Sequence, residues 1–81
     1  MHNPPEIALF VDGFDWQVPE SELLRLFQQV GDVIGLKVVK QADGSPAAII
    51  AMARMQDAED AILKYDGTHY RSVVLRVRKA D

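Results

Sequence analysis

The order in which strand-like and helix-like segments follow one another is the feature that most constrains this fold. Short β-rich runs are expected at residues 7–11, 33–40, 47–54 and 73–78, with helical patterns at residues 19–31 and 57–67. This order is β-α-β-β-α-β, the split βαβ arrangement. Right-handed crossovers place both helices on one face of a four-stranded antiparallel sheet. The sequence therefore predicts an α+β sandwich whose other sheet face is open.

The two helical patterns have recognisable ends and one apolar face each. The first begins at Pro19 with acidic residues in its first turn and closes at Gly31. The second begins at Asp57 and closes at Asp66-Gly67. The residues predicted to pack on the sheet are Leu23, Leu26, Phe27 and Val30 from the first helix and Ala58, Ala61, Ile62 and Tyr65 from the second.

Composition is typical of one ordinary globular domain. The 81 residues are 48% hydrophobic and 26% charged, which excludes a mainly disordered chain. We expect residues 1–6 to form a flexible lead-in, residues 7–79 to form the domain and residues 80–81 to form a tail. The fit to a single domain is also compatible with excision from a longer protein.

Several functional classes are excluded by what the sequence lacks. The absence of cysteine excludes disulfides and thiolate chemistry. The apolar run at residues 47–53 is too short to span a bilayer, and the N-terminus lacks a signal-peptide pattern, so we expect an intracellular protein. No nucleophile–base pair or phosphate-binding glycine loop is present, and neither His2 nor His69 belongs to a ligand cluster. We therefore predict no enzyme activity, no cofactor and no metal.

Charge is distributed unevenly along the chain. The net charge is −3, which argues against strong nonspecific binding to nucleic acid. However, residues 71–79 contain Arg71, Arg76, Arg78 and Lys79 and no acidic residue. The last predicted strand is therefore basic in an acidic chain.

Several segments resemble the RNA-recognition motif (RRM) family. Residues 9–14, Leu-Phe-Val-Asp-Gly-Phe, are similar to its first-strand RNP2 motif. Residues 15–23, 26–27 and 30–31 are similar to its first loop and helix, residues 57–62 to its second helix, and residues 66–70 and 75–77 to its fourth strand. The resemblance covers nearly the whole chain and implies a ferredoxin-like βαββαβ fold with an RNA-binding sheet face.

The third strand departs from the family pattern. The family's RNP1 motif on this strand presents aromatic rings and a basic residue. The corresponding stretch of this chain is residues 45–52. Ala47 and Ile49 occupy two expected aromatic positions, and Ser45 replaces the basic residue. Stacking contributes ~1–3 kcal/mol per base, so the loss of two rings predicts weak RNA binding.

Strand alternation predicts which side chains occupy the open face. They are Ala8, Phe10 and Asp12; Gly35, Lys37 and Val39; Ala47, Ile49 and Ala51; and Val74, Arg76 and Arg78. We expect single-stranded RNA to stack on Phe10 beside Ile49. Phosphate contacts are expected from Arg76, Arg78, Lys79 and Lys37, with support from Lys40. A role in RNA processing or metabolism follows from the resemblance.

A protein-interaction module is the alternative hypothesis. In this interpretation Phe10 covers an aliphatic patch with Ile49 and Val39, which would bind a partner or a second copy. Leu24 and Leu63 lie off the predicted core stripes and would mark a docking site on the helices if they lie together. Trp16 is expected to pack its loop against the first helix.

Overall fold

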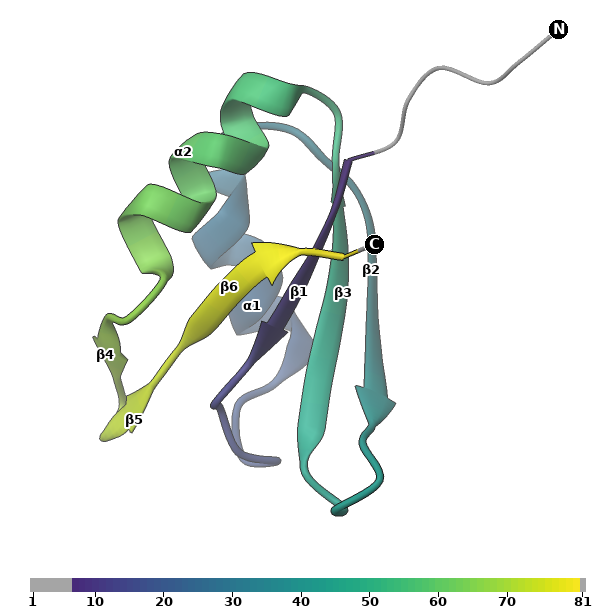
Figure 1. Cartoon of the computed structure of the whole chain (residues 1–81), viewed down its shortest axis with the longest axis vertical. Coiled ribbons are helices and arrows are strands. Elements are labelled where there is room, and N and C mark those ends of the chain that lie inside the picture. Colours follow the sequence, from purple (N-terminus) through teal and green to yellow (C-terminus); the bar gives the residue numbers. More distant parts are fainter. Residues whose placement is uncertain (1–6, 81) are drawn as a thin grey trace, which may run out of the picture.

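The computed structural model describes residues 7–80, which form two layers (Figure 1). One layer is a four-stranded antiparallel sheet in the order β2-β3-β1-β6. The strands are β1 (Ile7–Asp12), β2 (Val33–Lys40), β3 (Pro46–Met52) and β6 (Arg76–Lys79). Helices α1 (Glu20–Gln28) and α2 (Met55–Tyr65) both lie on one side of it. The predicted α+β architecture is confirmed; the predicted lead-in lies outside the described residues.

Both helices start after a residue with extended backbone. Pro19 caps α1 at φ −74° and ψ 155°, and acidic residues follow it in the first turn. Arg54 caps α2, which therefore begins at Met55 rather than at the predicted Asp57. The backbone amide of Ala58 donates to the Arg54 carbonyl at 3.1 Å, which closes this earlier first turn.

The core lies between the helices and the covered face of the sheet. Its largest fully buried side chains are Phe27 and Leu23 from α1, Leu9 and Val11 from β1, Ile50 and Met52 from β3, and Leu75. The rings of Phe27 and Tyr65 join the two helices with centroids 5.1 Å apart. The Tyr65 hydroxyl donates to the Leu26 carbonyl at 2.6 Å, so this nearly buried phenol has a partner. Ala58, Ala61 and Tyr65 are buried as predicted.

The fourth predicted strand, residues 73–78, is not continuous. Val73–Val74 forms β5, which pairs with β4 (His69–Tyr70) in a separate two-stranded hairpin. Arg71 and Ser72 turn this hairpin with φ values of 52° and 71°. The placement of Val74 on the open sheet face was therefore wrong, because only β6 pairs with β1.

The remaining strand predictions differ only at their ends. The third strand begins at Pro46 and ends at Met52, not at residue 54, because Arg54 already caps α2. β2 has the predicted bounds, but Val33 and Gly35 pair with consecutive residues of β3, which leaves Ile34 as an extra residue without a partner on β3.

No helix within residues 7–80 has the length and apolar character needed to cross a membrane.

Candidate nucleic-acid interface

One row of side chains crosses the open face through all four strands. Lys37 on β2 lies opposite Ile49 on β3, Ile49 lies opposite Phe10 on β1, and Phe10 lies opposite Arg78 on β6. We call these four residues the central row. Phe10 and Ile49 are half-buried, whereas Lys37 and Arg78 are exposed. The row therefore places an aromatic and an aliphatic side chain between two cations.

The Arg78 guanidinium lies over the ring of Phe10. Its Cζ is 4.7 Å from the ring centroid, within the range of a cation–π interaction. Within residues 7–80, no carboxylate lies at ion-pair distance from Arg78. The positive charge of Arg78 is thus held at the ring without being neutralised by an acid.

The neighbouring row contains a charge that is already paired. Asp12 lies opposite Arg76, and Val39 lies opposite Ala47. The register that pairs Val11 with Ala48 brings Asp12 beside Ala47 one residue further along. We call Asp12, Arg76, Val39 and Ala47 the paired-charge row.

Arg76 binds Asp12 through two parallel hydrogen bonds. Its Nε donates to Oδ1 and its Nη2 donates to Oδ2, each at 3.0 Å. Asp12 is only 8% exposed, and its hydrogen bonds and charge raise the pKa of Arg76 above the usual value. Much of the charge of Arg76 is therefore balanced locally, although the sequence predicted a phosphate contact.

Ala47 does not occupy an accessible position on this face. The sequence placed Ala47 and Ile49 together as two missing aromatic platforms. Ala47 lies on the expected face but is completely buried, whereas Ile49 is partly exposed. Only the position of Ile49 therefore has room for a stacking group in this backbone.

Two hollows flank the rows, and Arg78 lines both. The first has a volume of about 510 Å³ and is lined by Phe10, Arg78, Lys79 and Ala80. The second has about 470 Å³ and is lined by Asp12, Gln41, Asp66, Arg76, Val77 and Arg78. Beside the first hollow the face is flat, because the next row consists of Gly35, Ala51 and Ala8.

Asp12 lies on the open face as expected from strand alternation, but no sequence pattern indicates a role for Asp12, Gln41 or Asp66. Gln41 donates from Nε2 to the Pro46 carbonyl at 3.2 Å and to the Ser45 hydroxyl at 3.0 Å. Asp66 accepts a hydrogen bond from the Val77 amide at 3.0 Å. The opposite charges of Asp12 and Arg76 are compatible with an ion pair, but only the β1–β6 register shows that the two residues lie opposite each other.

Lys79 and Lys40 differ from the other predicted cations. Lys79 lines the first hollow, but its Nζ is 3.6 Å from Glu59 Oε2 on α2. Its partner across the sheet is Leu9, a core residue, so Lys79 belongs to the covered side.

Lys40 follows Val38 by two residues and lies on the covered side as well. Of the predicted cations, only Lys37 and Arg78 therefore lie on the open face without a paired acid among the described residues.

Trp16 joins two loops rather than packing its loop against the first helix, as was predicted. Its indole Nε1 donates to the Gly44 carbonyl at 2.9 Å, and the side chain is 56% exposed. The bond connects the loop after β1 to the loop between β2 and β3. Trp16 is therefore structural, but its partner is a loop at the end of the sheet.

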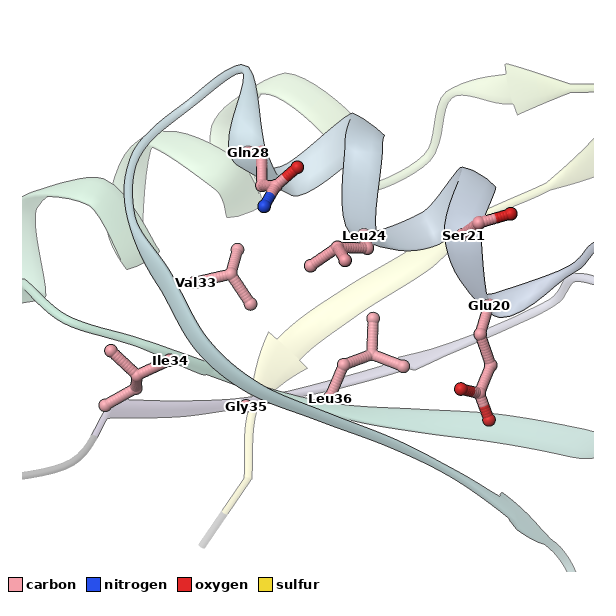
Figure 2. A pocket seen from close by; sticks show the side chains of 8 residues that line it. All are labelled: Glu20, Ser21, Leu24, Gln28, Val33, Ile34, Gly35 and Leu36. Carbon is pink, nitrogen blue, oxygen red and sulfur yellow. The ribbon is translucent and has the colours of Figure 1, made fainter.

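Leu24 and Leu63 belong to different surfaces. Leu24 is half-buried in a groove between α1 and β2, together with Val33 and Leu36 (Figure 2). Leu63 on α2 is 82% exposed and does not line that groove. The two leucines do not form the single docking site that the sequence suggested. Val39 is half-buried beside Ala47 on the open face.

Known proteins share both the sequence pattern and the fold. A polyadenylate-binding protein, cytoplasmic and nuclear, from Encephalitozoon cuniculi is 30% identical over 76 residues, which cover 93% of this chain and 15% of that protein. This chain thus spans a small part of that relative's length.

Solved structures show the same fold at lower identity. The structure of the Rna15 RRM with bound RNA (GU) matches with a TM-score of 0.79 and 21% identity over 90% of this chain and 81% of that one. RNA recognition domains 1 and 2 of Sex-lethal from Drosophila melanogaster match with a TM-score of 0.82 and 22% identity over 93% of this chain and 50% of that one. A family model described as the RNA recognition motif matches residues 9–76. The chain therefore belongs to the RNA recognition motif family.

Proposed function

We propose that this domain binds single-stranded RNA weakly on its open sheet face, through the central row. Membership of a family of RNA-binding modules supports RNA binding at the coarse level. The observation that carries the detailed proposal is the half-buried side chain of Phe10, set between Ile49 and the unneutralised guanidinium of Arg78. The role is binding without catalysis.

A base would stack on Phe10 while cations contact the backbone. Because Arg78 already lies over the ring, a stacking base must move the guanidinium aside or insert beneath it. A displaced Arg78 remains close to the nucleotide and can contact its phosphate. Lys37, at the other end of the central row, is placed to contact a neighbouring phosphate.

The expected affinity of the isolated domain is low. One ring contributes ~1–3 kcal/mol of stacking, and the face offers few unpaired cations. The loop from residue 41 to residue 45 is also short. Useful affinity would come from neighbouring domains or from several copies acting on one RNA. A role in RNA processing or metabolism, inside the cell, is part of this proposal; the relative's name gives cytoplasm and nucleus for that protein.

An NMR titration with short random-sequence single-stranded RNA at low salt tests the proposal. We expect the largest chemical-shift changes at Phe10, Ile49 and Arg78, and a loss of most of the affinity in Phe10→Ala. Arg25→Ala, which removes a cation from exposed α1 surface, is the control and should bind like the wild type. Unchanged spectra at Phe10 and Arg78 at saturating RNA would exclude this site. A face that instead binds protein would show no RNA-dependent shifts.

A further inference from the structure

The outer edge of β2 carries backbone groups without a strand partner. β2 is the end strand of the sheet and pairs only with β3 within the described residues. Beyond the extra residue Ile34, residues 35–40 continue in regular register with β3. An edge strand of this kind presents a row of N–H and C=O groups that another strand can bind.

The same edge borders an apolar groove with one acidic end. Leu24 from α1 faces Val33 and Leu36 from β2 across a space of about 600 Å³ (Figure 2). Glu20 lines the groove as well, and within residues 7–80 no cation lies at ion-pair distance from it. An occupant that fits must supply an extended backbone, apolar contacts and a positive charge.

We propose that the occupant is β2 of a second copy of this chain, paired antiparallel about a two-fold axis through Val38. A two-fold axis through Lys37 would oppose the two Lys37 side chains, and like charges directly opposite one another are destabilising. An axis through Leu36 would draw Ile34 and its irregular pairing into the new ladder. The axis through Val38 avoids both problems, because it pairs Val38 with Val38, Lys37 with Val39 and Leu36 with Lys40.

This register also meets the charge requirement of the groove. Leu36, Val38 and Lys40 alternate onto the helix side of β2, so Lys40 of the second copy enters beside Leu36. Leu36 and Glu20 line the same groove, so the ammonium group approaches the Glu20 carboxylate while the aliphatic stem covers Leu36. The two-fold symmetry forms the same pair twice.

The pairing would extend the candidate RNA surface. Antiparallel neighbours place their side chains on the same face, so both helix layers lie on one side and both open faces on the other. Two central rows would then share one continuous sheet. If the proposed RNA binding holds, an RNA long enough to reach both rows gains affinity from the second contact.

Analytical ultracentrifugation of the whole chain, from low micromolar to millimolar concentration, tests the dimer. We expect the mass to rise towards twice that of the monomer. Glu20→Lys and Lys40→Glu should each weaken association several-fold, and the double variant with the charges exchanged should restore it. Asp60→Lys on α2, with the same charge change as Glu20→Lys, is the matched control and should associate like the wild type.

NMR spectra across the same concentrations locate the contact. Concentration-dependent shifts at residues 36–40 support the β2 pairing. A strict monomer at millimolar concentration overturns it, as do shifts confined to Phe10 and Ile49, which would indicate association through the open face. Phe10→Ala separates the two proposals, because it removes RNA stacking but leaves the β2 edge unchanged. Loss of RNA binding with an intact dimer, or the reverse, is therefore distinguishable.

Discussion

The central row and the paired-charge row lie side by side on the same sheet, but they use their arginines differently. Arg78 lies over an aromatic ring without a carboxylate at ion-pair distance, whereas Arg76, two residues earlier, is held by both oxygens of Asp12. Ile49 in the first row is partly exposed, and Ala47 in the second is completely buried. Two cations and two replaced aromatic positions that look equivalent in sequence are thus unequal in structure.

The binding capacity of such a face therefore depends on what each side chain already contacts. A guanidinium that already forms a bidentate pair binds a new anion less favourably, because the existing pair must be broken or shared. A guanidinium over a ring keeps its full charge. The comparison can be tested one position at a time.

Ile49→Phe should change RNA binding most, by raising the affinity. The new ring would lie beside Phe10 in the central row and offer a second stacking platform. Stacking contributes ~1–3 kcal/mol per base, so the affinity for short single-stranded RNA should rise between about 5-fold and 150-fold. Fluorescence anisotropy with labelled RNA measures this. Unchanged affinity would mean that bases do not reach this row.

The matched substitution in the other row should fail. Ala47→Phe introduces a ring at a completely buried position, and overpacking of this kind costs ~1–3 kcal/mol of the free energy of unfolding. Urea unfolding followed by circular dichroism measures the loss. A variant as stable as the wild type, with RNA affinity raised as in Ile49→Phe, would show that the two positions are equivalent after all.

The two arginines should separate in the salt dependence of RNA binding. Each phosphate contact adds about 0.7 to the slope of log K against log salt for single strands. Arg78→Ala should reduce this slope by about one contact, whereas Arg76→Ala should leave it nearly unchanged. Arg76→Ala should change the free energy of unfolding only slightly, because the Arg76 side chain is largely exposed and its ion pair is screened by solvent. Equal slopes in the two variants would contradict the distinction between the rows.

Releasing Arg76 from its ion pair with Asp12 should change RNA binding least. Asp12→Asn keeps the shape of the side chain but removes its charge, which leaves Arg76 free to contact phosphate. We expect RNA affinity to rise by a few-fold at low salt and the slope to steepen by up to about 0.7. Asp60→Asn on α2 changes the net charge equally and serves as the control. A loss of affinity in Asp12→Asn would imply that RNA contacts the carboxylate directly.

Much of the fold could be predicted because its signals are local. Helical spacing identified Leu23, Phe27 and Tyr65 as core residues, and all three are buried. Alternation along β1 and β3 separated Leu9 and Ile50 from Phe10 and Ile49 correctly. These patterns are written within single elements, so no knowledge of neighbouring elements was needed.

The candidate site was harder to predict because it depends on register and on long-range contacts. Nothing local distinguishes Arg76 from Arg78; the difference arises from the residue that β1 places opposite each one. Val73–Val74 pairs with His69–Tyr70 instead of β1, and that hairpin turns at Arg71 and Ser72 with a left-handed backbone that neither residue type favours. Trp16 contacts Gly44, 28 residues away, and no periodicity in the sequence could indicate that partner.

The Trp16–Gly44 hydrogen bond has a practical consequence. Trp16 is the only tryptophan of the chain, and its indole spans two loops at the same end of the sheet. Its emission should therefore shift when those loops separate or become drier. The domain thus contains an intrinsic optical probe, and ligand binding or loop opening can be followed in the native chain without attaching a dye.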